Sequence, residues 1–552
     1  MRLLYFFAFL TLGLCACQPD KPSADTIYYN ASIWTGDPEQ PFATALALKE
    51  GSILFVGEDF QPYQGQETEL VDVQGHLLVP GFMDNHTHFL DGGFQLASVE
   101  LRAAQTPEDF IRLLAEFAHT LPNDGRWILG GNWDHEAWGG ELPRREWIDS
   151  VTAGHPVFVS RLDGHMALAS TQVLELAGIT KDTPDPEGGT IIKDPLTGEP
   201  TGILKDEAMS VVYAILPDRT AAELDEALQR AVTHALSLGV TQVHDVGSFG
   251  GWPDLATYRR ANKKGELHMR VYSFVPISSW GKLADYVAEN GTGDDVLRWG
   301  ALKGFVDGSL GSTTAWFYNP YDDEPQTSGL LVNDTTQLRN WILAADSAGL
   351  HIGVHAIGNR ANDWLLNVYA EAIGRNGQRD RRFRIEHAQH LTREAMGRFA
   401  ELGVIPSMQP YHAIDDGRWA EKRIGPERIK TTYPFRSLLD AGASLTFGSD
   451  WTVAPLNPLE GIYAAVTRRT LDGANPKGWM PQEKISVEEA LRCYTAANAY
   501  AGYQEGRLGV LKPGYRADFV ILSENIFEVA PERIKEVEVL RTVVNGEAVY
   551  VK

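Results

Sequence analysis

Eight short apolar runs that alternate with helical stretches constrain the fold of this chain more than any other feature. Amphipathic segments such as residues 221–239 separate most of the runs. Such alternation is typical of parallel βα units. Eight units are the number that closes a (β/α)₈, or TIM, barrel, so we predict an α/β fold of this type. The predicted strands lie at residues 81–86, 241–245, 269–275, 301–307, 350–355, 383–387, 404–408 and 444–450.

The rest of the chain predicts two additions to the barrel, which itself spans residues 81–504. The gap between the first two strands is too long for one crossover, so residues from about 95 to 235 should include an inserted subdomain. Alternating runs with Gly-rich turns occupy residues 25–80 and 505–552. Neither set is large enough for its own core, so we expect both chain ends to form one small β-sandwich.

The first 16 residues predict a bacterial export signal. Arg2 precedes an apolar run that is too short to span a bilayer. The run ends in Leu14-Cys15-Ala16-Cys17, which resembles a lipoprotein signal, although a plain secretory signal is the alternative. We expect a lipid on Cys17 that attaches the chain to a membrane, followed by a tether over residues 17–24. Because Gln18 rather than Asp follows, the resemblance implies the outer membrane of a Gram-negative bacterium, facing the periplasm.

Charge and cysteine content narrow the range of partners. The chain has 73 acidic and 49 basic residues, a formal charge of −24. This excess repels phosphate backbones, so we expect no nucleic-acid partner. Of the three cysteines, processing would remove Cys15 and lipidate Cys17, which leaves Cys493. The sequence therefore predicts neither an intrachain disulfide nor a cysteine-based metal site.

Metal-compatible side chains gather at the ends of the predicted strands. His86 and His88 end the first strand and, being two residues apart, point to the same side. The carboxyl ends of the strands form the mouth of such a barrel. A lone histidine there is commonly structural, but the combination predicts a metal site. The other strand ends carry Lys303, His355, His387 and Asp450.

Nearly the whole mature chain resembles the amidohydrolase superfamily, and within it the YtcJ-like branch that includes N-substituted formamide deformylases. The resemblance rests on the motifs PGFMDNHTH, GGNWD, RLDGHMALAS, LKGFVDGSLGS, HAIGNR, RIEHAQ, FGSDW and LGVLKPGYRADFVIL. It implies that Lys303 is carboxylated and bridges two divalent metals. It further implies a first metal on His86, His88 and Asp450 and a second on His355 and His387. Nitrogen and oxygen ligands without thiolate suit zinc, at one or two ions per chain.

This ligand set predicts an enzyme rather than a binding protein. A metal-bound hydroxide is a good nucleophile near neutral pH, and Asp450 is placed to pass its proton to a leaving amine. We therefore expect hydrolysis of an amide-type C–N bond in a small, N-substituted amide. Hydrolysis of an ester, a carbamate or a cyclic amide on the same site remains open, as does a catalytically silent binding lipoprotein. The oligomeric state also remains open.

The insertion offers three weaker candidates for substrate contact: Trp133, Asp134 and His165. They lie in Gly-rich turns, which are either structural or part of a lid over the mouth. In the lid interpretation, Trp133 would contact an apolar group and His165 would donate a hydrogen bond.

Further candidates belong to the barrel strands. His244 ends the second strand and either orients a ligand or is structural. Gln409 and His412 follow the seventh strand and are candidate pocket-lining residues. Arg384 and Glu386 precede His387, and strand alternation predicts that they point away from the site.

Overall fold

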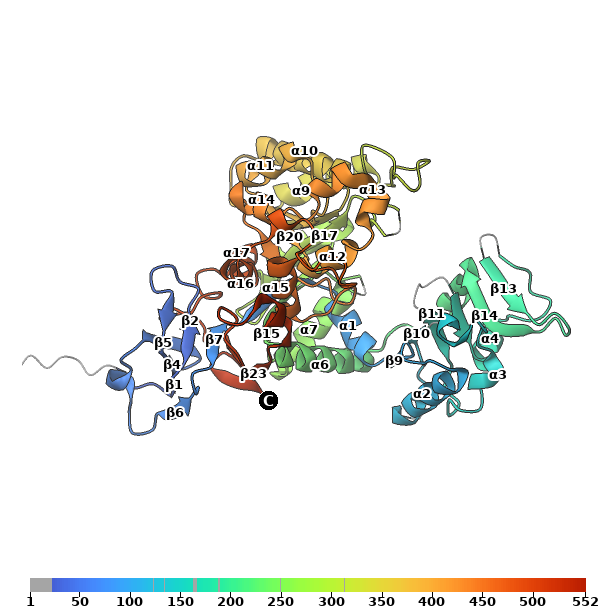
Figure 1. Cartoon of the computed structure of the whole chain (residues 1–552), viewed down its shortest axis with the longest axis horizontal. Coiled ribbons are helices and arrows are strands. Elements are labelled where there is room, and N and C mark those ends of the chain that lie inside the picture. The colour runs from blue at the N-terminus through green and yellow to red at the C-terminus, as the bar shows by residue number, and fades with distance from the viewer. Residues whose placement is uncertain are drawn as a thin grey trace, which may run out of the picture.

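The computed structural model describes residues 22–552 except 123, 134, 162–165, 187–188, 249 and 312. Its four sheets build a barrel, a domain made from the two chain ends and a separate insertion (Figure 1). The predicted signal, Cys17 and most of the tether lie outside the described residues, as do Asp134 and His165. Across the part of the chain that is described, none of the helices combines the length and apolarity that crossing a bilayer requires.

Eight parallel strands form the central barrel and overlap the eight predicted runs. A parallel bridge between Thr87 and Trp451 joins its two outer strands, so the barrel is nearly closed. This arrangement confirms the predicted fold class. In spatial order the strands are β8 (Phe82–Thr87), β15 (Val240–Asp245), β16 (Arg270–Pro276), β17 (Leu297–Phe305), β18 (His351–Ala356), β19 (Arg384–His387), β20 (Ile405–Met408) and β21 (Thr446–Phe447).

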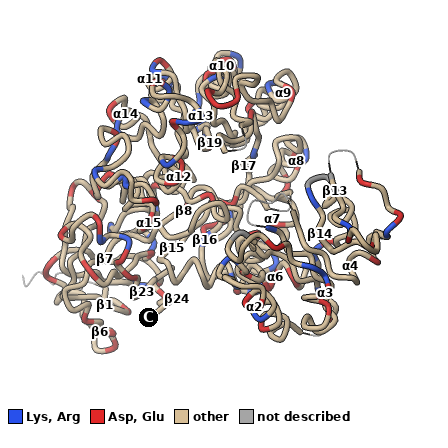
Figure 2. Tube along the Cα trace, turned by 45° about the vertical axis from the view of Figure 1, so that its right-hand side comes forward, with Lys and Arg blue, Asp and Glu red and all other residues tan. Residues whose placement is uncertain are grey.

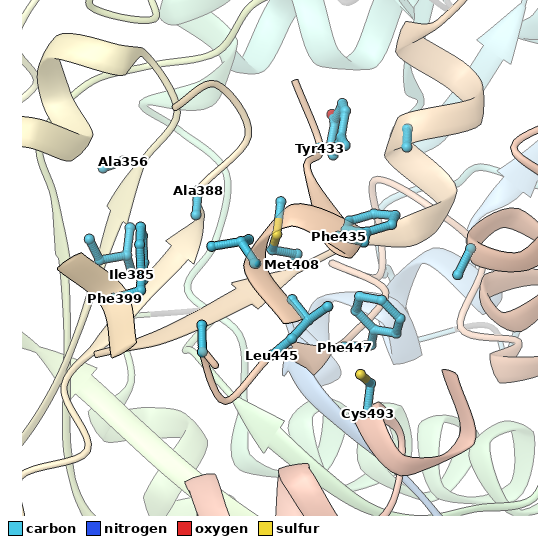
Figure 3. Close-up of a cluster of buried hydrophobic side chains, with 14 of the residues drawn as sticks. Ala356, Ile385, Ala388, Phe399, Met408, Tyr433, Phe435, Leu445, Phe447 and Cys493 are labelled. Atoms are coloured by element: carbon cyan, nitrogen blue, oxygen red, sulfur yellow. The ribbon is translucent and has the colours of Figure 1, made fainter. Parts of the chain in front are cut away.

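Helices cover the outside of the barrel. The first, α6, is capped by Thr220, whose hydroxyl accepts from the Glu223 N–H while the Glu223 side chain accepts from the Thr220 N–H. This capping box fixes the start of the helix. Apolar side chains such as Ile385, Phe399 and Met408 fill the space between strands and helices (Figure 3). The helices are α6 (Ala221–Ser237), α7 (Trp252–Lys264), α8 (Trp280–Asn290), α9 (Thr335–Ser347), α10 (Asn359–Asn376), α11 (Arg393–Leu402), α12 (Pro410–Asp416), α13 (Ala420–Arg428), α14 (Phe435–Asp440), α15 (Pro458–Thr467), α16 (Val487–Cys493) and α17 (Ala496–Ala501).

Both chain ends contribute strands to the domain beside the barrel. One sheet has the order β5-β4-β1-β6 and the other β24-β23-β22-β7-β2-β3, so N-terminal and C-terminal strands share a sheet. Leu46, Leu78 and Phe519 lie in the common core. The strands are β1 (Thr26–Tyr29), β2 (Ser32–Trp34), β3 (Phe42–Ala43), β4 (Ala45–Lys49), β5 (Ser52–Gly57), β6 (Glu69–Asp72), β7 (Leu77–Pro80), β22 (Phe519–Leu522), β23 (Val539–Val544) and β24 (Glu547–Val551).

The insertion lies between α1 (Phe89–Leu96) and α6 and projects from the barrel beyond these helices (Figure 1). Its sheet has the order β13-β14-β12-β11-β10-β9. It also has a core of its own, which includes Phe110 and Leu168. Acidic and basic residues are scattered over its surface and over the outer helices of the barrel (Figure 2). Its elements are β9 (Val99–Glu100), α2 (Pro107–Thr120), β10 (Gly130–Trp133), α3 (Arg145–Ile148), β11 (Phe158–Arg161), β12 (Met166–Ala169), α4 (Thr171–Leu176), β13 (Gly189–Lys193), β14 (Pro200–Asp206) and α5 (Ser210–Tyr213).

Candidate metal centre

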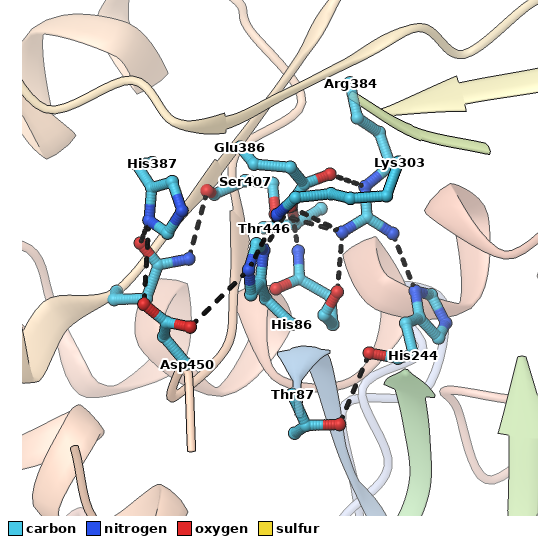
Figure 4. Close-up of polar contacts among 12 residues, drawn as sticks. His86, Thr87, His244, Lys303, Arg384, Glu386, His387, Ser407, Thr446 and Asp450 are labelled. Atoms are coloured by element: carbon cyan, nitrogen blue, oxygen red, sulfur yellow. Dashed lines mark hydrogen bonds and ion pairs between the residues drawn. The ribbon is translucent and has the colours of Figure 1, made fainter. Parts of the chain in front are cut away.

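Asp450 lies within reach of His86 and His387, at the carboxyl ends of the barrel strands (Figure 4). Its Oδ1 is 3.6 Å from His86 Nε2 and 3.5 Å from His88 Nε2. Its Oδ2 is 4.0 Å from His387 Nδ1. Two atoms that each bind one zinc ion at about 2.0–2.2 Å are separated by similar distances. The His86, His88 and Asp450 side chains therefore fit a divalent metal.

The two histidines of the first strand each keep one ring nitrogen for a ligand. The Nδ1–H of His86 donates to Glu386 Oε2 at 2.5 Å, and the Nδ1–H of His88 donates to the Gly247 carbonyl at 2.7 Å. In each ring this leaves the Nε2 lone pair facing Asp450. Burial and the nearby Lys303 lower the pKa of His86 to about 4. Its imidazole is therefore neutral at pH 7, which metal binding requires.

Lys303, His355 and His387 form a second group beside the first. The Lys303 Nζ lies 3.1 Å from His86 Nε2, and the ring centroids of His355 and His387 are 4.5 Å apart. The Nε2–H of His355 donates to the Gly308 carbonyl, and the Nδ1–H of His387 donates to Gln409 Oε1. Each of these two rings therefore also keeps one nitrogen without a proton.

Lys303 is buried in a strand that is otherwise largely apolar. Burial lowers the pKa of its ammonium group to about 8. Asp307, the acid nearest in sequence, does not neutralise it, because the Asp307 carboxylate accepts the backbone N–H groups of Trp316, Ile357 and Gly358. An appreciable fraction of Lys303 is therefore neutral amine near pH 7.

The backbone around Asp84 and Gly448 aligns the first and last strands. The Asp84 carboxylate accepts the backbone N–H of His86 and of Ser449, each at 3.0 Å. A Cβ on Gly448 would lie 2.6 Å from Asp84 Oδ1, so this close approach requires glycine. Asp450 has φ +60°, a left-handed conformation that is costly for a non-glycine residue and that recurs at functional sites.

The structure corrects the predicted orientation of Arg384 and Glu386. Both are fully buried and point into the barrel, where Glu386 accepts from His86, Arg384 and Ser407 (Figure 4). Strand alternation fails here because His387, the last residue of β19, has a φ of +73°. Burial alone would raise the pKa of Glu386, but Arg384 and His86 hold it well below its usual value. Glu386 is therefore an anion that orients His86.

His412, which the sequence offered only as a candidate pocket-lining residue, lies beside the predicted ligands. It lies in the first turns of α12, and with His387 and Asp450 it forms a second group of potential ligand atoms, all within 4.8 Å of one another. In the sequence, the feature that points to His412 is its place four residues after the end of the seventh strand.

Two weaker candidates lie away from the mouth. Trp133 is fully buried in the core of the insertion, and its Nε1 donates to the Val159 carbonyl at 2.9 Å. Its predicted contact with substrate is therefore wrong. His244 is fully buried, and its Nδ1 accepts from Arg384 at 2.9 Å. It contacts the Arg384 side chain rather than any of the predicted metal ligands.

This chain is similar in sequence to a known protein family and to several known proteins. The amidohydrolase family profile matches residues 69–550. Protein LONG AFTER FAR-RED 3 of Arabidopsis thaliana is 41% identical, over 96% of this chain and 92% of that protein. YtcJ of Bacillus subtilis is 31% identical, over 95% and 99%. The N-substituted formamide deformylase of Arthrobacter pascens is 29% identical, over 95% and 98%.

This chain also resembles solved protein structures. An uncharacterized metal-dependent hydrolase from Pyrococcus furiosus superposes with a TM-score of 0.77 at 29% identity. The match covers 91% of this chain and 100% of that one.

Proposed function

Since the chain belongs to the amidohydrolase family and is thus an enzyme that acts on C–N bonds, we propose that it hydrolyses a small N-substituted amide. The observation that carries the proposal is the place of Asp450. One of its oxygens faces His86 and His88, and the other faces His387 and His412. The relative from Arthrobacter pascens, whose name is N-substituted formamide deformylase, supports this substrate class.

We further propose zinc as the metal, held by His86, His88 and Asp450 and, in a second position, by His355 and His387. Neutral imidazoles and carboxylates suit zinc, and no cysteine lies in these motifs. A bound zinc ion supplies Lewis acidity and makes water more acidic. Within the chain, Asp450 accepts the proton of the attacking water and returns it to the nitrogen of the leaving amine.

Lys303 is the proposed bridge between the two metal positions. The neutral amine of a buried lysine adds to carbon dioxide and releases a proton, which gives a carbamate whose two oxygens share one negative charge. The lowered pKa of the Lys303 ammonium group, about 8, supports this reaction at neutral pH. The Lys303 Nζ lies 3.1 Å from His86 Nε2, and this closeness to the first group of ligands supports the proposed bridge.

An apolar entrance supports a substrate with an apolar N-substituent. Phe305 lies two residues after Lys303 on β17, so it points to the same side, and 37% of its surface is exposed. Its ring centroid is 5.4 Å from that of His355. Leu331 and Val332 are also exposed, and they pair with the backbone that follows β17.

The proposal is tested by turnover and metal content of the same preparation. Zinc-loaded protein should hydrolyse N-alkyl and N-benzyl formamides or related N-acyl amines faster than matched esters, carbamates and lactams. Bound zinc should amount to one or two ions per chain. Faster turnover of an ester or lactam would refute the substrate class. Protein without bound metal or activity would instead support the binding-protein alternative.

Membrane attachment is a separate proposal, because it concerns residues outside those described. We propose that the lipid on Cys17 anchors the enzyme to the outer membrane, facing the periplasm. Cys17→Ala should release the protein into the soluble fraction or leave it unprocessed. Unchanged partition of that variant with membranes after a high-salt wash would refute the anchor.

A further inference from the structure

We infer that His412 is a catalytic residue whose Nε2–H donates a hydrogen bond to the substrate carbonyl oxygen as that oxygen gains negative charge. This role rests on the amide hydrolysis proposed above. It adds a residue from α12, the helix after the seventh barrel strand, which contributes no ligand to the metal positions proposed above.

The position of His412 places it at the reacting centre. Helix α12 starts at Pro410, directly after β20, so its first turns face the barrel mouth. His412 Nε2 lies 4.0 Å from Asp450 Oδ2, the oxygen that does not face His86 or His88. Its ring is nearly parallel to that of His387, with centroids 6.5 Å apart. A substrate that reaches Asp450 therefore also reaches His412.

The Nε2 atom of His412 is buried and has no hydrogen-bond partner among the described residues. Leaving a buried polar atom without a partner costs about 1–3 kcal/mol, so such an atom calls for an explanation. His390 also has an unpaired, buried Nε2, but its neighbours are the rings of Phe317 and Tyr433. His412 differs because it faces a carboxylate and a predicted metal ligand.

The surroundings of His412 fit a hydrogen bond to the substrate better than they fit a bound metal ion. The His387 nitrogen that lies 4.0 Å from Asp450 Oδ2 is Nδ1. That nitrogen carries a proton, because it donates to Gln409 Oε1, whose own amide group donates to the Ser407 carbonyl. A metal held by this nitrogen together with His412 and Asp450 would break the bond to Gln409. The arrangement therefore leaves His412 for the substrate.

The proposed step balances without a further reactant. Water adds to the carbonyl carbon, and the C=O π electrons move to the oxygen, which accepts the His412 hydrogen bond. When the C–N bond breaks, that electron pair returns to form the carboxylic product. Asp450 passes the proton of the water to the departing nitrogen, and His412 keeps its own proton. Removing one such donor typically lowers kcat by about 10²–10³-fold.

Two substitutions at His412 test this role in the full-length, zinc-loaded enzyme. His412→Phe keeps a ring but removes the donor, and we expect kcat and kcat/KM to fall by about 10²–10³-fold with KM and zinc content little changed. His412→Gln places an amide N–H near the position of Nε2 and should recover part of the loss. His390→Phe is the matched control, since it removes a buried histidine with an unpaired nitrogen elsewhere, and it should leave kcat unchanged.

The possible results separate this inference from the proposed function. Loss of zinc from His412→Phe would make His412 a ligand and overturn the inference. A kcat of His412→Phe equal to that of the wild type would also overturn the inference about His412. In that case, amide turnover by the wild type would leave the proposed function intact. A wild-type enzyme that turns over none of the amides would overturn both.

Discussion

Strand β18 carries two histidines, one at each end, and they differ in how the protein uses their ring nitrogens. At the lower end, His351 is bonded through Nδ1 to Tyr272 at 3.0 Å and through Nε2 to the Arg382 carbonyl at 2.8 Å. At the mouth, His355 is bonded through Nε2 to Gly308. Both are buried, and burial lowers the pKa of each to about 3. The candidate ligand His355 therefore differs from His351 in having a ring nitrogen that the protein leaves free. The two histidines do not differ in burial.

Arg384 connects the lower level of the barrel, which holds His351 and His244, with the upper level, which holds the candidate ligands. Its NH1 donates to His244 below, and its NH2 donates to Glu386 above, which in turn holds His86 (Figure 4). The lower level is thus a buried polar network that supports the upper one. The following predictions test this division, from the largest expected loss of activity to the smallest.

Asp450→Asn should have the largest effect. The amide keeps the size of the side chain but cannot accept the proton of the attacking water, so kcat should fall by about 10²–10⁴-fold. Steady-state kinetics on the best substrate, with zinc content measured in parallel, checks this. Full activity in the variant would remove Asp450 from the mechanism.

Lys303→Ala should lose zinc and most of the activity, because it removes the proposed bridge. Formate or acetate can fill the vacated space and should restore part of both. Zinc analysis and turnover with and without added acid provide the measurement. Full zinc content together with full turnover would leave a single-metal site on His86, His88 and Asp450.

Glu386→Gln should weaken zinc binding by about 10–100-fold, the usual effect of removing a carboxylate that orients a histidine ligand. Competition with a chelator of known affinity measures this change. Excess zinc should restore much of the turnover, which separates an effect on binding from an effect on chemistry. Unchanged affinity would mean that Glu386 only completes the network with Arg384 and Ser407.

The pair His351→Phe and His355→Phe tests the comparison on one strand. His351→Phe leaves two buried groups without partners, so it should destabilise folding by about 1–3 kcal/mol for each group and leave zinc content and kcat unchanged. His355→Phe should instead lower zinc content. Urea denaturation and metal analysis of both variants provide the test. Equal zinc loss in the two variants would contradict the division into levels.

The barrel and the side chains at its strand ends could be predicted because both follow from periodicity along the chain. The direction of Glu386 could not, since the φ of +73° at His387 is a local departure from strand geometry that composition does not reveal. His412 could be predicted only as a pocket-lining residue, because it lies on a helix after its strand and no spacing rule ties it to the metal ligands. Trp133 follows two glycines at the end of β10, and such a Gly-rich context accompanies core and lid positions alike.

The terminal domain determines the order in which the chain can fold. Pro80 of β7 pairs with Phe519 of β22, and Arg270 on a barrel strand forms a buried ion pair with Asp518. Contacts between residues so distant in sequence form slowly, because the intervening loop must close first. The N-terminal strands emerge first during synthesis yet must wait for the last residues before their sheet is complete. The chain therefore stays without its finished terminal domain throughout synthesis, and its exposed strand edges need protection until the C-terminus arrives.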